Sequence, residues 1–321
     1  MSAYIGVDIG GTNIVCGLLD DQLNLLRKTK KPTGASNGAD YVLRLIASMI
    51  DELLEREKLT RVDVAAVGMG NPGFVDPVRG VSLSSANLKW ENVPVSDLLG
   101  GLLGGIPVFI DNDVRMYTYG EAARGAGRGY DHVMGVTLGT GIAAAMVGRG
   151  ELYYGSGFLA GELGHVPLEG ENALCGCGMR GCLETIASAT GIARIARERL
   201  EQGEASVLQQ WFPGDGRKDV TAADVSRAYD EGDALAVDVL RFVGRHLARG
   251  LAWAITLWSP DVVVIGGGAA NAGERLLAPM REALMPLILP MYRGVAIKLA
   301  EMNDDAGVVG SAAFAKARAG A

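Results

Sequence analysis

The sequence predicts an α/β protein with two similar halves, each built on a mixed β-sheet. Apolar strand-like runs alternate with helical runs along the chain, a pattern typical of sheets covered by helices. The strand, glycine turn, strand, turn, strand pattern of residues 3–29 recurs at 132–155, about 130 residues later. A length of 321 residues also suits two modest domains better than one core. We expect a cleft between the two halves, which is the default place for a ligand.

In the first half, the three-stranded meander is followed by alternating helices and strands. Residues 39–58 place apolar side chains on one helical face, namely Val42, Leu45, Ile46, Met49, Ile50, Leu53 and Leu54. The run VDVAAVGMG at 62–70 is an apolar strand that ends in glycine. Residues 106–113 form a further strand, whose polar end should lie at a strand-to-helix junction, because a helix is expected from Val114 to Ala123.

The second half repeats the same unit. Helices are expected around 184–202, 221–230 and 232–257, followed by an apolar strand, DVVVIGGGAA, at 261–270. A helix at 273–286, a last strand at 294–300 and a final helix at 306–318 complete the chain. We expect an N-terminal α/β domain over 1–120, completed by the C-terminal helix at about 304–321, and a larger C-terminal domain over 121–303.

Composition and charge limit the class of protein. The chain is 49% hydrophobic and 21% charged, as in an ordinary soluble protein with a buried core, and its net charge is −7. Because nucleic-acid binders usually show a basic face and this chain is acidic overall, we expect no nucleic-acid partner. No window approaches 18 apolar residues, and a strand-like run follows Met1 directly, so neither a membrane span nor a secretion signal is expected. We therefore expect a cytoplasmic protein, in which stable disulfides are rare.

Three glycine turns follow apolar strands: DIGGTN at 8–13, TLGTGI at 137–142 and IGGGAA at 265–270. Glycine lets backbone amides face an anion without obstruction, and Asp8 could hold Mg²⁺ through water. A single loop of this kind is equally consistent with a simple turn. The Rossmann and P-loop patterns do not fit, because the first loop leads into a strand and lacks Gly-Lys-Ser/Thr. The predicted contacts of these turns with a phosphate ligand and its Mg²⁺ are Asp8, Gly10, Gly11, Thr12, Asn13, Thr137, Gly139, Thr140, Gly141, Gly266 and Gly267.

The stretch CGCGMRGC at 175–182 holds three of the four cysteines, and His165 precedes it by ten residues. One imidazole and three thiols form the ligand set of a closed tetrahedral zinc site, so we predict structural Zn²⁺ held by His165, Cys175, Cys177 and Cys182. A redox pair would more often have Cys-x-x-Cys spacing, although thiol chemistry and unliganded cysteines remain alternatives. Cys16 is expected in the core.

The motifs GELGH and CxCGxxGCLE, together with DIGGT and TLGTG, resemble the ROK family (repressors, open reading frames, kinases). The resemblance extends from Ala3 to the last helix, and the cysteine block is its most specific part. It implies the two-domain fold of sugar kinases, Hsp70 and actin, which is ribonuclease H-like, with a duplicated mixed sheet and an interdomain cleft. Paired phosphate-binding turns are the arrangement of these ATPases.

The resemblance also implies a sugar site. Asp113 would be the general base, and the sugar contacts would be Gly73, Asn87, Asn112, Asp113, Glu162, His165 and Glu184. The alternative for Asp113 is a helix N-cap, which is common at a strand-to-helix junction. For Glu162 and Glu184 the alternative is a solvated or helix-capping acid.

By this resemblance, the chain would be an ATP-dependent hexose kinase, a glucokinase type, acting on the sugar 6-hydroxyl, and commonly a homodimer. Kinases for allose, mannose, fructose or N-acetylmannosamine share the ligands, and the strings ANLKW and DNDV depart from many glucokinases. A ROK regulator lacking its DNA-binding domain is a further alternative. The strand-like run that begins at Tyr4 favours a kinase, because repressors carry an extra N-terminal helix-turn-helix. A non-sugar ATPase of the Hsp70 or actin type fits the cysteine block poorly.

Overall fold

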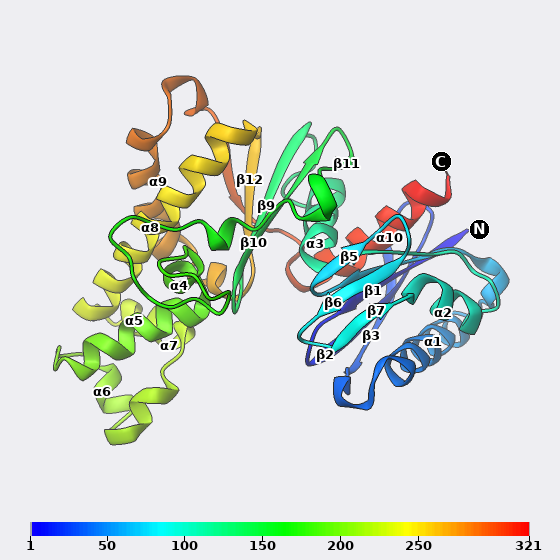
Figure 1. The fold of residues 1–321 in the computed structure, drawn as a ribbon, viewed down its shortest axis with the longest axis horizontal. Helices are drawn as coiled ribbons and strands as arrows, with labels where there is room; N and C mark the ends of the chain where they lie inside the picture. Colours follow the sequence, from blue (N-terminus) through cyan, green and yellow to red (C-terminus); the bar gives the residue numbers. More distant parts are fainter. Residues whose placement is uncertain (1, 321) are drawn as a thin grey trace. The chain divides into compact units, whose positions relative to one another are not determined.

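The computed structural model describes residues 2–320, which divide into two compact units (Figure 1). Unit 1 comprises the described residues up to Gly135, together with Ala145–Ala160 and the chain from Ala300 onward. Unit 2 comprises Val136–Ala144 and Gly161–Leu299. Residues 121–135 and 145–160, which the sequence assigned to the second domain, therefore group with unit 1.

A five-stranded sheet with the order β3-β2-β1-β4-β8 forms the centre of unit 1. Its strands are β1 (Ala3–Ile9), β2 (Asn13–Leu19), β3 (Leu25–Pro32), β4 (Val64–Asn71) and β8 (Val108–Asn112). Strands β1, β2 and β3 pair antiparallel, whereas β4 pairs parallel to both β1 and β8. The predicted meander and the strands after it are thus confirmed as a mixed sheet.

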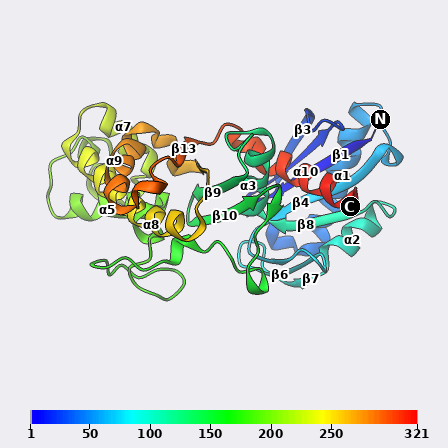
Figure 2. The same cartoon turned by 90° about the horizontal axis from the view of Figure 1, so that it is seen from above.

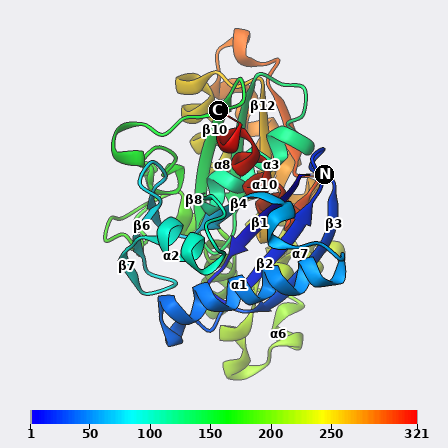
Figure 3. The ribbon, with the colours of Figure 1, turned by 90° about the vertical axis from the view of Figure 1, so that its right-hand side faces the viewer.

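Helices cover both faces of this sheet (Figures 2 and 3). The odd-numbered residues of β1, such as Ile5 and Val7, join the apolar side of α1 (Ala39–Arg56) in one buried core. On the other face, α10 (Ala306–Ala319) packs on β1 and β4, and α3 (Asp113–Arg124) packs on α10. Helix α10 lies directly against the backbone of β1 and β4, because a Cβ at Gly6 or Gly68 would overlap carbonyl oxygens of α10.

Unit 1 also contains a small antiparallel sheet of β5 (Phe74–Asp76), β6 (Val81–Ser85) and β7 (Trp90–Val93). Helix α2 (Val95–Leu102) follows it and packs on α1 and β8. No helix or strand was predicted between residues 70 and 106, because strands this short do not show clear alternation.

The sheet β11-β10-β9-β12-β13 has the same order of successive strands as the first sheet. Its strands are β9 (His132–Leu138), β10 (Ile142–Gly148), β11 (Glu151–Leu152), β12 (Val262–Gly266) and β13 (Ala296–Leu299). The first three strands repeat the strand–turn–strand pattern of β1 to β3, as the sequence predicted. The duplicated α/β architecture is therefore confirmed.

The helices of unit 2 are α4 (Glu184–Ala187), α5 (Ala189–Glu201), α6 (Leu208–Trp211), α7 (Ala222–Asp230), α8 (Ala234–Trp258) and α9 (Glu274–Leu284). The predicted continuous helix over 184–202 is wrong. Ser188 is extended, and its hydroxyl accepts a hydrogen bond from the Gly191 amide, so it ends α4 and caps α5. No helix within residues 2–320 combines the length and apolar character that crossing a bilayer requires.

Candidate functional site

The first glycine turn opens onto a cavity of about 540 Å³ in unit 1. The turn is closed by a hydrogen bond from the Gly10 amide to the Asn13 carbonyl, 2.8 Å long. The cavity is lined by Asp8, Gly10, Gly11, Thr12, Asn13, Val15, Lys28, Thr29, Lys30 and Asp304. Five predicted nucleotide contacts therefore share one cavity wall with two lysines and with the carboxylate of Asp304.

Asp8 lies at the end of β1, where α10 begins. A Cβ at Gly307 would lie 2.8 Å from the Asp8 carboxyl carbon, so glycine at this position makes room for the carboxylate. Burial, together with the negative charges of Asp113 and Asp304, raises the pKa of Asp8 to about 7. Because these surroundings disfavour the charged form of Asp8, a bound cation would stabilise that form.

Asn112 and Asp113 occupy the junction between β8 and α3. The Asn112 side-chain oxygen caps α3 by accepting hydrogen bonds from the amides of Val114 and Arg115, at 3.0 and 3.2 Å. The Asn112 side-chain amide donates to Oδ1 of Asp113 at 2.9 Å and to the Gly73 carbonyl at 3.1 Å. The helix cap is thus Asn112, which leaves Asp113 as the first residue of α3. Burial raises the pKa of Asp113 above its usual value, as a general base near neutral pH requires.

The predicted sugar contacts of unit 1 lie beside the glycine turn. A Cβ at Gly11 would lie 3.4 Å from the Asn87 Cβ, so the Asn87 side chain contacts the turn. Gly73 has a positive φ of 95°, and a Cβ there would overlap the Ser84 carbonyl oxygen. Unit 1 therefore brings together Asp8, the first glycine turn and the predicted Gly73, Asn87, Asn112 and Asp113.

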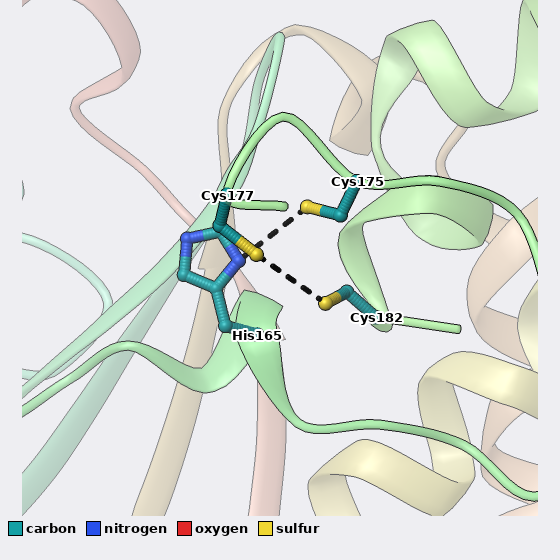
Figure 4. Close-up of side chains that lie close together, drawn as sticks. All are labelled: His165, Cys175, Cys177 and Cys182. Atoms are coloured by element: carbon teal, nitrogen blue, oxygen red, sulfur yellow. Dashed lines mark hydrogen bonds between the residues drawn. The ribbon is translucent and has the colours of Figure 1, made fainter. Parts of the chain in front are cut away.

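In unit 2, the four predicted metal ligands converge (Figure 4). Their ligand atoms all lie within 4.8 Å of one another. The Sγ atoms of Cys177 and Cys182 are 3.7 Å apart, and Cys175 Sγ lies 3.6 Å from Nδ1 of His165. Zinc–sulfur bonds of about 2.3 Å and zinc–nitrogen bonds of about 2.0 Å at tetrahedral angles give separations of about 3.8 and 3.5 Å. The cluster thus fits a tetrahedral ion, and its sulfur separations exclude a disulfide, whose bond is about 2.05 Å.

Glu184 connects this cluster to the second glycine turn. Its Oε2 accepts a hydrogen bond from the Ile142 amide at 3.0 Å, and Cys175 Sγ lies 3.6 Å from its Oε1. A Cβ at Gly141 would overlap the Glu184 carboxylate, so only glycine permits this approach. Glu162 is exposed instead, and its Oε2 lies 3.9 Å from the outward Nε2 of His165.

The comparisons with known proteins agree with this geometry. The sequence model of the ROK family matches residues 4–318. The chain belongs to the ROK family. It is 38% identical to a glucokinase of Thermotoga maritima over 98% of both chains. Among solved structures, it is similar to a ROK glucokinase from Streptomyces griseus in complex with glucose and AMPPNP, with a TM-score of 0.81, 34% identity and coverage of 98% and 100%. A ROK hexokinase from Thermus thermophilus has a TM-score of 0.83 at 29% identity, with 98% of each chain covered.

The third glycine turn of this ROK protein follows β12. Gly267 has a positive φ of 87°, and a Cβ there would lie 2.7 Å from the Leu138 carbonyl oxygen, so this glycine serves close packing of β12 on β9. A cavity of about 180 Å³ lies next to it, lined by Ile192, Ala222, Ala223, Ser226, Gly268, Ala269, Asn271 and Ala272. This lining includes neither Gly266 nor Gly267. The sequence did not predict this cavity, because residues from three separate segments of the chain form its wall.

Proposed function

We propose that this ROK protein is an ATP-dependent hexose kinase, most specifically a glucokinase, that phosphorylates the sugar 6-hydroxyl. The observation that carries the proposal is the Asp113 carboxylate, held beside Asn112 in the unit that contains the first glycine turn and Asp8. The glucokinase relative at 38% identity over 98% of both chains supports the same activity.

In the proposed mechanism, Asp113 accepts the proton of the attacking hydroxyl. Burial raises the pKa of this carboxyl, so its conjugate acid forms more readily than that of an exposed aspartate. The hydrogen bond from Asn112 fixes the direction in which the carboxylate faces. Proton transfer by a positioned group of this kind contributes about 10²- to 10⁴-fold in rate.

The glycine turns are proposed to hold the phosphates of ATP. Gly10, Gly11, Thr12 and Asn13, with Thr137, Gly139, Thr140 and Gly141 from the second turn, would contact the phosphates. The amides of Gly10 and Gly139 close their turns on the Asn13 and Gly141 carbonyls, so other groups of the turns would donate to the phosphate oxygens. Gly266 and Gly267 remain proposed nucleotide contacts of the third turn. Bound Mg²⁺ would offset the charge on the transferring phosphoryl group, and Asp8 is the residue that would hold it.

The remaining sugar contacts are proposed residue by residue. Gly73, Asn87 and Asn112 of unit 1 are proposed sugar contacts, and so are Glu162, His165 and Glu184 of unit 2. His165 turns Nδ1 toward the thiols, which leaves Nε2 for a hydroxyl or for Glu162. We propose that structural Zn²⁺ occupies the cluster of His165 and three cysteines and orders this segment. About one zinc per chain in elemental analysis is the expected result.

A coupled assay for ADP release, run with a panel of hexoses, tests the proposal. Glucose is expected to be the preferred substrate, with allose, mannose, fructose and N-acetylmannosamine as competitors. Asp113→Asn should lower kcat by at least about 100-fold while leaving glucose binding measurable by calorimetry. The exposed Asp97→Asn is the matched control and should keep wild-type turnover. A sugar-responsive regulator would bind a hexose without releasing ADP, and near-full activity of Asp113→Asn would reject the assigned base.

We also propose a homodimer. Phe242, Trp253 and Leu257 lie on one stripe of α8 and are 37%, 62% and 73% exposed. A second copy of the chain covering this stripe would remove apolar surface from water. Sedimentation at micromolar concentration should give twice the 33.6 kDa chain mass.

A further inference from the structure

Asp111, which directly precedes the proposed base pair, forms a buried ion pair that the mechanism above does not use. Its Oδ1 accepts hydrogen bonds from Nε of Arg115 and from the Asn112 amide, both 2.6 Å long. Its Oδ2 accepts a hydrogen bond from the Tyr154 hydroxyl at 2.8 Å. Asp111 and Arg115 are 0% and 5% exposed. Since a buried ion pair contributes little net stability over an apolar pair, its presence favours a role in positioning.

Asp111 and Arg115 also bind the segment from Tyr153 to Phe158. Nη1 of Arg115 donates to the Phe158 carbonyl at 3.0 Å, and the guanidinium lies 5.3 Å from the centre of the Tyr154 ring. The rings of Tyr154 and Phe158 pack edge to face, with centroids 5.6 Å apart. Phe158 has a φ of 61°, a conformation that an aromatic residue adopts only when its surroundings impose it.

A continuous path of hydrogen bonds connects Tyr154 to Asp113. Tyr154 holds Asp111, Asp111 holds the Asn112 amide, and the Asn112 side chain holds both Asp113 and Gly73. The turn that contains Phe158 also packs against β5, which begins directly after Gly73. Displacement of the 153–158 segment would therefore move both the proposed base, Asp113, and the proposed sugar contact Gly73.

We propose that Tyr154, Asp111 and Arg115 form a positioning network that holds the Asn112–Asp113 pair in the geometry needed for phosphoryl transfer. The proposal rests on the proposed hexose kinase function. It assigns Tyr154 and Arg115 as positioning residues, since neither has a role as a substrate contact. Burial raises the pKa of Asp113, and the positive charge of Arg115 opposes that increase. Arg115 therefore also lowers the pH at which Asp113 ionises.

Tyr154→Phe tests the network, because it removes one hydroxyl and keeps the ring. Its matched control is Tyr153→Phe at the neighbouring, 57% exposed position. Tyr154→Phe should lower kcat with glucose by about 10- to 100-fold, because small misplacements of a reacting group have effects of that order. Its KM for ATP should stay within about twofold of wild type, and Tyr153→Phe should match wild type in both constants.

Arg115 supplies a second readout that a merely structural role would not change. Arg115→Gln removes the positive charge, so the pKa of Asp113 should increase and the acid limb of the kcat–pH profile should move to higher pH. Arg115→Lys keeps the charge and should return the acid limb to its wild-type position. If an Arg115 variant fails to fold, as judged by circular dichroism, Tyr154→Phe decides the matter.

The possible outcomes separate the two proposals. A wild-type protein that releases no ADP with any hexose rejects the function, and the network proposal with it. An active wild type for which Tyr154→Phe and Tyr153→Phe have equal kcat overturns the network alone. An unchanged kcat accompanied by a lower unfolding midpoint would also overturn it, because the network would then serve stability only.

Discussion

The raised pKa of Asp8 predicts that this one carboxyl makes the protein without ligand less stable as the pH increases. The folded-state pKa is about 7, against an ordinary value of 3.8, because the carboxylate is buried near Asp113 and Asp304. Between those values, the folded chain keeps a proton that the unfolded chain has lost. The stabilisation is therefore complete below about pH 3.8 and is lost as the pH increases to about 7.

The size of the effect follows from the shift. Each pKa unit corresponds to about 1.36 kcal/mol, so moving from about pH 5.5 to above pH 7 loses about 2 kcal/mol at most. Because Asp8 is partly accessible to solvent, we expect about 1 kcal/mol. Asp8→Asn keeps the shape of the side chain and removes the ionisation. From about pH 5.5 to above pH 7, the unfolding free energy of the variant should therefore increase by about 1 kcal/mol relative to that of wild type.

Urea unfolding of both proteins at about pH 5.5 and about pH 8, followed by circular dichroism, measures this difference. A wild-type stability that increases relative to Asp8→Asn at the higher pH would refute the reasoning. Added Mg²⁺ at about pH 8 should stabilise wild type more than Asp8→Asn, if the ion binds at this carboxylate. An equal response of the two proteins would place the ion elsewhere.

Three further outcomes are expected. Gly68→Ala should destabilise the chain by about 3 kcal/mol in urea unfolding, because its Cβ would overlap the Ser311 carbonyl oxygen. Gly101→Ala, which lies in helix α2 and meets no atom within 4 Å, should not destabilise the chain. Trp253→Glu should convert the proposed dimer to a 33.6 kDa monomer in sedimentation; a variant that remains dimeric would place the interface elsewhere. Cys177→Ser should lose zinc in elemental analysis and bind glucose more weakly; full zinc retention would contradict the ligand set.

Much of the fold could be predicted from the sequence because its signals are local. The strands β1, β4 and β12 are largely apolar and have glycine at or next to their ends, and helix α1 is eighteen residues long. The sheet of β5 to β7 escaped prediction because its strands have only three to five residues. The break at Ser188 was also missed, because the flanking sequence is helical in pattern and one extended serine interrupts it.

The candidate site also combines residues that local motifs identify with contacts that only the folded chain reveals. Asn112 and Asp113 are adjacent in the sequence, and the three thiols lie within eight residues, so short motifs were enough to identify them. Tyr154 stands 43 residues after Asp111, and their hydrogen bond depends on how the β10–β11 hairpin lies against β8. No periodicity or spacing encodes such a contact, which only the folded chain reveals.

The Glu184 carboxylate links the cluster of His165 and three cysteines to the second glycine turn. One oxygen of its carboxylate accepts the Ile142 amide, and the other lies 3.6 Å from the Cys175 sulfur. Without metal, the Cys175 thiol carries a proton that it can donate to Glu184. A bound zinc ion would require the thiolate, which has no proton to give, so that carboxylate oxygen would be free to accept a hydrogen bond from a hydroxyl of the proposed sugar ligand. Loss of zinc would therefore weaken sugar binding through Glu184 even where the fold of unit 2 survives.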